Sequence, residues 1–165
     1  MTRASSIVTL SLLCLLAAAT PARADVTAFI GVTPTPHNHS VRGFSGGIGL
    51  LIVGFEFEYA HIAEDQLEAL PSLKTWSGNV LAQTPFDILG MQLYGTIGAG
   101  GYREYLESGA VTFEETNAAI NTGGGAKIKL LGPVRVRVDY RVFKLKGNPL
   151  NTVYQRFYVG GNLKF

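Results

Sequence analysis

Residues 134–142 read Val-Arg-Val-Arg-Val-Asp-Tyr-Arg-Val, and this strict alternation decides the fold. Successive side chains on a β-strand point to opposite faces. The stretch therefore places apolar side chains on one face and Arg135, Arg137, Asp139 and Arg141 on the other. A helix would scatter both sets around its circumference. A strand of about nine residues is also near the length that crosses a bilayer at a tilt.

This strand has two interpretations, which differ in where its apolar face points. In a soluble sandwich or carrier, the apolar face packs into the core and the charged side chains face water. In a transmembrane barrel, the valines face lipid and the charged side chains face a polar lumen. The rest of the sequence has to distinguish the two.

The N-terminal segment has the features of a secretory signal peptide. Residues 7–20 are apolar apart from hydroxyl groups, and Ala22-Arg23-Ala24 offers small residues for a cleavage site. We predict that residues 1–24 are a signal peptide cut before Asp25, and that residues 25–165 form one folded domain. A retained anchor is disfavoured because the apolar stretch is too short to span a bilayer.

Removal of the predicted signal peptide changes both the cysteine and the charge inventory. Cys14 is the only cysteine, so the mature chain has no disulfide, thiol nucleophile or thiolate metal site. A lipoprotein would be anchored through Cys14, but Leu13 precedes it where a small residue is needed. Two of the 14 basic residues also leave, so 12 basic residues face 12 acidic ones. We expect no nucleic-acid partner.

The mature chain is poor in charge for its size. Its 24 charged residues are about 17% of the 141 that remain, against roughly 25% in ordinary soluble domains. The longest mature apolar run, residues 46–55, is far short of the ~20 residues of a spanning helix. Low charge indicates a membrane, and without a spanning helix only a closed β-barrel satisfies its backbone in lipid.

The mature chain divides into eight strand-like runs, each with apolar residues at one parity and small or polar residues at the other. We predict strands at residues 26–33, 42–50, 54–61, 75–84, 92–103, 117–130, 134–142 and 154–165. The joins alternate in length, with short turns near residues 51–53, 85–90 and 131–133 and longer polar loops at residues 34–41, 62–74, 104–116 and 145–153. Short turns at one end and long loops at the other are typical of outer-membrane barrels.

Glycine is frequent inside these runs, where it normally weakens a strand and marks a close approach. The interior of an eight-stranded barrel is filled by side chains. We therefore expect the glycines to make room for large inward residues such as Tyr94, Tyr102 and Tyr158. The alternative is that they only adjust the twist of the sheet.

The chain resembles the small eight-stranded outer-membrane proteins of the OmpA/OmpX type, a porin-like outer-membrane β-barrel family. The resemblance covers residues 25–165, and its most specific part is the last run, which alternates through Phe157, Val159 and Leu163 and stops on Phe165. It implies an all-β fold: an eight-stranded antiparallel up-and-down transmembrane β-barrel, preceded by a cleavable signal peptide.

The resemblance also implies a location and partners. It places the barrel in the outer membrane of a Gram-negative type of cell, in contact with outer-membrane lipid, with both termini in the periplasm. Phe165 would be the assembly signal that the barrel-assembly machinery reads. We expect a monomer without the peptidoglycan-binding domain of some relatives. The modest loops do not support an adhesin or receptor role.

The best candidate for a functional site is a network of charges in the lumen. Glu56 and Glu58 lie just after the first short turn, and Arg135 and Arg137 just after the third, on strands that face each other across the ring. Long arginine side chains can meet the carboxylates there, and we expect the network to be completed by Asp139, Arg141, Arg156, Lys127 and Lys129.

This network has a structural and a functional interpretation. Buried charges are tolerated only when they are paired and hydrogen-bonded, which makes the network a plug. A gate that rearranges to admit water or ions is the functional alternative. We favour the plug because a barrel this narrow is normally filled.

Other chemistry is weakly supported. His37 and His39 lie in a predicted loop without acidic or thiolate ligands, so we predict no metal site. An enzyme of the lipid A-modifying kind would need a Ser and a His on one face, whereas His39 and Ser40 are adjacent, and no third orienting group is evident. Residues 123–125 are glycines inside a strand, so they fail the context of a nucleotide motif, and we predict no cofactor.

We therefore expect a structural or interaction role in the cell envelope for a barrel with a plugged lumen, and no enzymatic activity. The first alternative is a narrow, gated channel for small solutes or ions. The second is a lipid A-modifying outer-membrane enzyme. A third class, a soluble lipocalin-like carrier, would also have eight strands but an apolar interior and a polar exterior.

Overall fold

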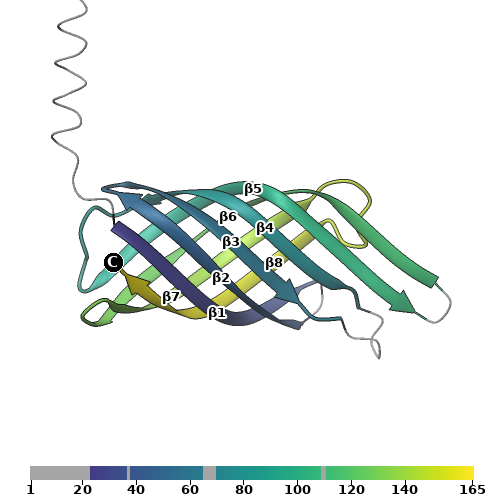
Figure 1. Ribbon diagram of the computed structural model, residues 1–165, viewed down its shortest axis with the longest axis horizontal. Coiled ribbons are helices and arrows are strands. Elements are labelled where there is room, and N and C mark those ends of the chain that lie inside the picture. The colour runs from purple at the N-terminus through teal and green to yellow at the C-terminus, as the bar shows by residue number, and fades with distance from the viewer. Residues whose placement is uncertain (1–22, 37, 65–69, 109–110) are drawn as a thin grey trace, which may run out of the picture.

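Eight antiparallel strands close into one barrel in the order of the sequence (Figure 1). The computed structural model describes residues 23–36, 38–64, 70–108 and 111–165. The strands are β1 (Arg23–Thr35), β2 (His39–Leu50), β3 (Val53–Ile62), β4 (Ser72–Gln83), β5 (Met91–Ser108), β6 (Val111–Leu131), β7 (Val134–Leu145) and β8 (Val153–Lys164). Each strand pairs with its sequence neighbours, and β8 closes the barrel on β1. The predicted eight-stranded up-and-down barrel is confirmed.

The predicted contrast between short turns and long loops is only partly present, because the joins β1–β2 (residues 36–38) and β7–β8 (residues 146–152) are no longer than the turn-end join at residues 84–90. At the turn end, residues 51–52, 84–90 and 132–133 connect the strands, and Gly132 adopts a positive φ of 55° that suits a tight turn. The first described residue and the C-terminus lie at this same end (Figure 1). The backbone N–H of Phe165 donates to the carbonyl of Ala24, so β1 extends over two residues of the predicted signal peptide. Most of that segment, residues 1–22, lies outside the described residues.

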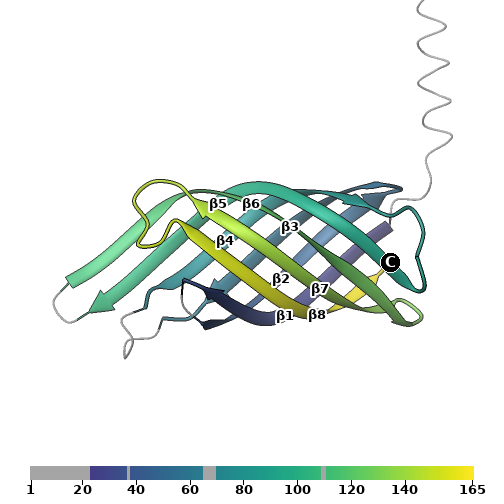
Figure 2. The same ribbon diagram turned by 180° about the vertical axis from the view of Figure 1, so that it is seen from behind.

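One predicted loop is wrong. Residues 104–108 and 111–116 belong to paired strands, because β5 and β6 remain paired out to Ser108 and Val111. The pairing of β4 with β5 stops at Tyr105, and the pairing of β6 with β7 starts only at Ala119. The hairpin therefore projects beyond the barrel wall (Figure 2).

The outer wall is apolar, and on β7 the apolar face points outward. On β7, Val134 and Tyr140 are 39% and 43% exposed, whereas Arg137 and Arg141 are 0% exposed. The other strands follow the same parity, with exposed residues that include Ile30, Phe44, Ile48, Phe55, Phe57, Val80, Leu93, Ile97, Phe157 and Val159. Soluble monomers rarely expose an apolar surface of this extent. The arrangement is that of a barrel in lipid and the reverse of a soluble carrier.

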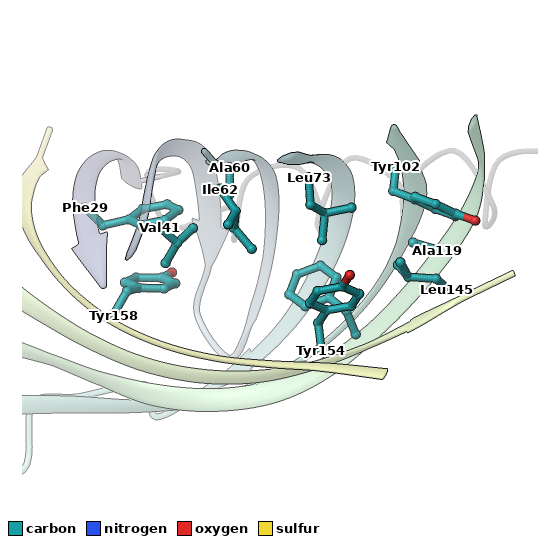
Figure 3. Packing of buried hydrophobic residues seen from close by; sticks show 11 residues of the cluster. Phe29, Val41, Ala60, Ile62, Leu73, Tyr102, Ala119, Leu145, Tyr154 and Tyr158 are labelled. Atoms are coloured by element: carbon teal, nitrogen blue, oxygen red, sulfur yellow. The ribbon is translucent and has the colours of Figure 1, made fainter. Parts of the chain in front are cut away.

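The interior contains an apolar layer that the sequence reasoning missed. Eleven buried residues form one cluster, contributed by all eight strands (Figure 3). Several of them point inward from the loop-end portion of their strands, including Val41, Ile62, Leu73 and Leu145. The lumen is therefore charged toward the turn end and mainly apolar toward the loop end, where the buried Glu104 accepts from the Tyr154 hydroxyl at 2.9 Å.

Glycines next to the large inward side chains provide space for them, as predicted. A Cβ atom added at Gly125 would lie 2.7 Å from the Tyr94 hydroxyl, and one added at Gly31 would lie 2.7 Å from the Tyr158 Cβ. Real Cβ atoms do not approach that closely. These glycines are therefore required by packing against the neighbouring strands, on which Tyr94 and Tyr158 are their register partners.

Candidate functional site: the charged lumen

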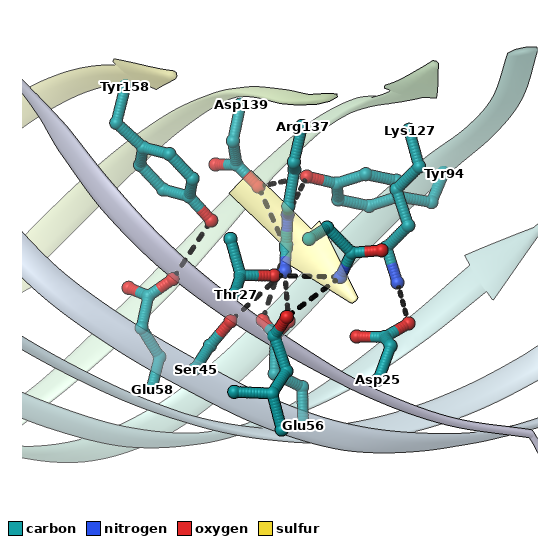
Figure 4. A network of polar contacts seen from close by, with 12 residues as sticks. Asp25, Thr27, Ser45, Glu56, Glu58, Tyr94, Lys127, Arg137, Asp139 and Tyr158 are labelled. Carbon is teal, nitrogen blue, oxygen red and sulfur yellow. Dashed lines mark hydrogen bonds and ion pairs between the residues drawn. The ribbon is translucent and has the colours of Figure 1, made fainter. Parts of the chain in front are cut away.

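Three strands supply the charged side chains that meet inside the barrel. Glu56 and Glu58 point inward from β3, because Phe55 and Phe57 occupy the outward parity. Arg137, Asp139 and Arg141 point inward from β7 and Arg156 from β8 by the same rule, and all six are 5% exposed or less. Strands β3 and β7 are opposite in the ring, so the carboxylates and guanidinium groups meet across the axis (Figure 4).

Glu56 is the first centre of the network. Arg137 donates to both oxygens of Glu56, with a distance of 3.2 Å from Nη2 to Oε1 and a shorter contact from Nη1 to Oε2. Arg141 Nη2 donates to Glu56 Oε1 at 2.8 Å. Two guanidinium groups therefore share one carboxylate, which satisfies both of its oxygens.

Asp139 separates the two arginines along β7. It accepts from Arg141 Nε at 3.0 Å and from Arg137 Nη2 at 3.1 Å. The Tyr94 hydroxyl donates to Asp139 Oδ2 and accepts from Arg137 Nε at 2.6 Å. The Arg137 guanidinium also lies 4.8 Å from the centre of the Tyr94 ring, a favourable cation–π distance.

Glu58 is the second centre. It forms an ion pair with Arg156, accepts from the Tyr158 hydroxyl at 3.2 Å, and lies 3.1 Å from Arg141 Nη1. This last contact is an ion pair without hydrogen-bond geometry. The Arg156 guanidinium lies 4.3 Å from the centre of the Phe143 ring, at the boundary with the apolar layer.

The network is electrically balanced. Three arginines face three carboxylates, and a fourth buried cation, Lys127, pairs with Asp25. Burying an unpaired charge costs several kcal/mol, whereas paired and hydrogen-bonded charges are tolerated. The arrangement is therefore one that a closed lumen can hold without bound counter-ions.

Two predicted participants lie elsewhere. Arg135 donates to Gln92 at 2.9 Å and lies 3.9 Å from Asp87, so it does not reach Glu56 or Glu58. It stands two residues before Arg137 on β7, which places it roughly 6.6 Å nearer the turn end. Lys129 is exposed at that same end. The network is therefore formed without Arg135 and Lys129, by residues that lie further from the turn end, such as Arg137.

A hollow of about 160 Å³ opens at the turn end, below the network. Charged and amide side chains line it, including those of Arg23, Asp25, Gln83, Gln92, Arg135 and Lys164. Above it lie the ion network and then the apolar layer. A solute entering from the turn end would meet the ion network first and the apolar layer second.

The histidines do not form a site together. His39 lies on β2 rather than in a loop, and Ser40 follows it on the opposite face, as their adjacency predicted. His61 is at the outward parity of β3, and His37 lies outside the described residues. In the described part of the chain, no three His, Cys, Asp or Glu side chains are arranged to hold a metal ion. That part also contains no helix long and apolar enough to cross a membrane.

Comparison with known proteins identifies the fold. No protein-family model matches the chain, and no curated protein matches it. The N-terminal β-barrel domain of Pseudomonas aeruginosa OprF is similar over 87% of this chain and 97% of that chain, with a TM-score of 0.69 and 14% identity. Ail, the attachment invasion locus protein of Yersinia pestis, matches 87% of this chain and 98% of its own, with a TM-score of 0.60 and 15% identity.

A third similar structure is the outer-membrane enzyme PagL, with a TM-score of 0.50, 12% identity, and coverage of 84% of this chain and 98% of that chain. Identities this low establish the fold alone. The chain has the fold of the small eight-stranded outer-membrane β-barrels of the OmpA/OmpX type. Because an enzyme shares this fold, the fold does not decide between a structural and a catalytic role.

Proposed function

We propose that this protein is an outer-membrane β-barrel with a closed lumen, which has a structural or interaction role in the cell envelope. Its short turns face the periplasm, and its loops and projecting hairpin face outward. The apolar outer wall and the similarity to outer-membrane barrels support this location. The proposal includes no catalytic activity and no conducted solute.

The observation that carries the proposal is that two successive layers, the ion network and the apolar layer, fill the lumen. A conducting path requires water beside the network and through the apolar layer of Val41, Ile62, Leu73 and Leu145. Each arginine of the network is paired with at least one buried carboxylate, so the charged layer is held together by mutual ion pairs.

Planar-bilayer recording tests the closure. We expect the purified protein to be silent under conditions in which a large porin gives discrete conductance steps. The informative variant is Glu56→Gln, which removes a charge from the lumen, and its matched control is Glu107→Gln, on the exposed hairpin. Discrete conductance in the wild type that changes with Glu56→Gln and not with Glu107→Gln contradicts the plug and supports a gated channel.

The gated channel is the second candidate because the turn-end hollow is lined by charged side chains, including Arg135, which lies two residues from Arg137 of the network. Arg135 and Lys164 line this hollow, so such a channel would admit small anions from the periplasmic side. A silent bilayer across a range of voltages argues against it.

A lipid A-modifying activity is the remaining alternative, and its only support is that an outer-membrane enzyme, PagL, shares the fold, which shows that the fold can carry catalysis. We expect the mass of lipid A to be unchanged when the protein is expressed. A mass change that is lost in His39→Ala contradicts the non-enzymatic proposal.

A further inference from the structure

Two cationic side chains, Arg42 and Lys74, flank a histidine on the outer wall. Arg42 on β2 pairs in register with His61 on β3, and His61 pairs with Lys74 on β4. All three are at the outward parity of their strands, and none is buried. In the row nearer the turns, Phe44, Tyr59 and Trp76 pair in the same order, so the cations border an aromatic row.

The height of this row matches the edge of a bilayer. On β2, Leu50 at the turn end lies eight positions after Arg42. At about 3.3 Å per residue and a tilt near 40°, they cover roughly 20 Å along the barrel axis. Outer-membrane barrels carry an apolar band about 25 Å tall, and the exposed turn residues Leu51 and Ile52 extend the band below Leu50. The cations therefore stand where lipid headgroups begin.

The next outward cation in this register, Arg103 on β5, is already engaged by Glu114 at 2.9 Å. Among the described residues, no carboxylate lies within 4.0 Å of the Arg42 guanidinium or the Lys74 ammonium group. The strands β2, β3 and β4 thus present positive charge toward the headgroup region.

An apolar groove runs beside these cations. Two adjoining hollows of about 520 and 770 Å³ lie over β8, β1, β2 and β3, and they share Ile30, Arg42, His61 and Val159 as lining residues. The hollow nearer the turns exists because Ala28 and Gly161 are small. A Cβ atom added at Gly161 would meet no atom within 4 Å.

We propose that this face is a binding site for one phosphorylated lipid of the outer leaflet. The phosphate lies against Arg42, His61 and Lys74, and an acyl chain occupies the groove toward Gly161. A guanidinium fork and an ammonium group are the side chains that best bind phosphate oxygens. The inference rests on the proposed function, because it requires the barrel to sit in a membrane.

The chain contains its own probe for this site. Trp76 is the only tryptophan in the sequence, and it lies two residues from Lys74 on the same outward face. The protein is reconstituted in vesicles that contain brominated phosphatidic acid or brominated phosphatidylcholine, and quenching of Trp76 fluorescence gives the relative binding of the two lipids. We expect phosphatidic acid to be favoured by about fivefold for each contributing cation.

Three variants separate a specific site from general surface attraction. Arg42→Gln combined with Lys74→Gln should reduce the preference to near one. Lys144→Gln is the matched control, because Lys144 is an exposed cation on β7, across the barrel, and it should leave the preference unchanged. Gly161→Leu fills the groove without changing charge and should reduce the preference at least twofold.

Equal quenching by the two lipids in the wild type, or a preference that survives the double variant, overturns the lipid site. A preference lost in the double variant but kept in Gly161→Leu overturns the acyl groove. If neither brominated lipid quenches Trp76, the barrel is not in the bilayer, and the proposed function itself fails. The two levels of the proposal are therefore tested separately.

Discussion

Individual side chains in the lumen show what parity can and cannot predict. Alternation along β3, β7 and β8 correctly placed Glu56, Asp139 and Arg156 inside, because parity alone decides which face a strand residue occupies. Parity does not give the height at which residues from different strands meet. For that reason the roles of Tyr94, Tyr158 and Ser45 as hydrogen-bond partners were missed, and Arg135 was assigned to the wrong carboxylates.

The first prediction concerns the different contributions of buried and exposed ion pairs to the free energy of unfolding. Arg137→Ala leaves Glu56 and Asp139 buried with fewer partners, so it should lower the free energy of unfolding by about 3–5 kcal/mol. Arg103→Ala breaks the pair with Glu114, whose side chains are 52% and 47% exposed, and should cost about 0–1 kcal/mol. Urea unfolding of the refolded barrel in lipid, followed by Trp76 fluorescence, measures both. Equal effects would show that the lumen is hydrated.

The second prediction concerns the interior glycines. Gly125→Ala forces a Cβ atom against the Tyr94 hydroxyl and should destabilise the barrel by about 1–3 kcal/mol. Gly161→Ala adds the same atom to open space on the outer wall and should change stability little. The same unfolding experiment compares the two. A neutral Gly125→Ala would mean that these glycines only adjust twist.

At the scale of the strands, the sequence was informative inside the membrane and misleading outside it. Within the bilayer each strand must present an apolar face to lipid, so the pattern marks the strand clearly. Beyond the bilayer that requirement ends, and the glutamates of residues 104–116 look like a loop although they pair as a hairpin. Near the loop end, inward positions such as Val41 and Leu73 are also apolar. The sequence there no longer alternates between polar and apolar residues, and for that reason the apolar layer was not predicted.

The third prediction uses proline to separate the barrel wall from the hairpin. Val138→Pro removes a backbone donor from β7, which is paired on both sides, and should prevent stable closure of the barrel. Leu106→Pro lies where β5 pairs only with β6, so the barrel should still fold. Folded barrels migrate faster than boiled ones on gels, and this mobility shift is the measurement. Loss of the shift in Leu106→Pro would make the hairpin part of the folding core.

The whole molecule combines a lipid-solvated exterior with an interior divided into ionic and apolar layers. The strand number and the direction of the wall were predictable, because they follow from the demands of a closed sheet in lipid. The function was not, since the same barrel carries proteins with different activities. Nothing in the strand pattern depends on a binding function of the loops.

The fourth prediction concerns assembly of the whole barrel. Phe165 is 74% exposed at the turn end, and only its backbone N–H is bonded, to Ala24. Phe165→Ala should therefore barely change the stability of protein refolded in detergent. In cells it should reduce the amount of folded barrel in the outer membrane, if the terminal aromatic is the assembly signal. Equal amounts of the two proteins in membrane fractions would exclude that role.

The central claim is that the valine face of β7 contacts lipid while its charged face is sealed inside. The chain without its first 24 residues has no cysteine, so Val138→Cys gives a single attachment site for a spin label. In vesicles, collision with dissolved oxygen reports lipid, and collision with a water-soluble nickel complex reports water. We predict strong oxygen contact and almost none with nickel. A label that collides with nickel, or one immobilised inside the protein and reached by neither reagent, would contradict the account.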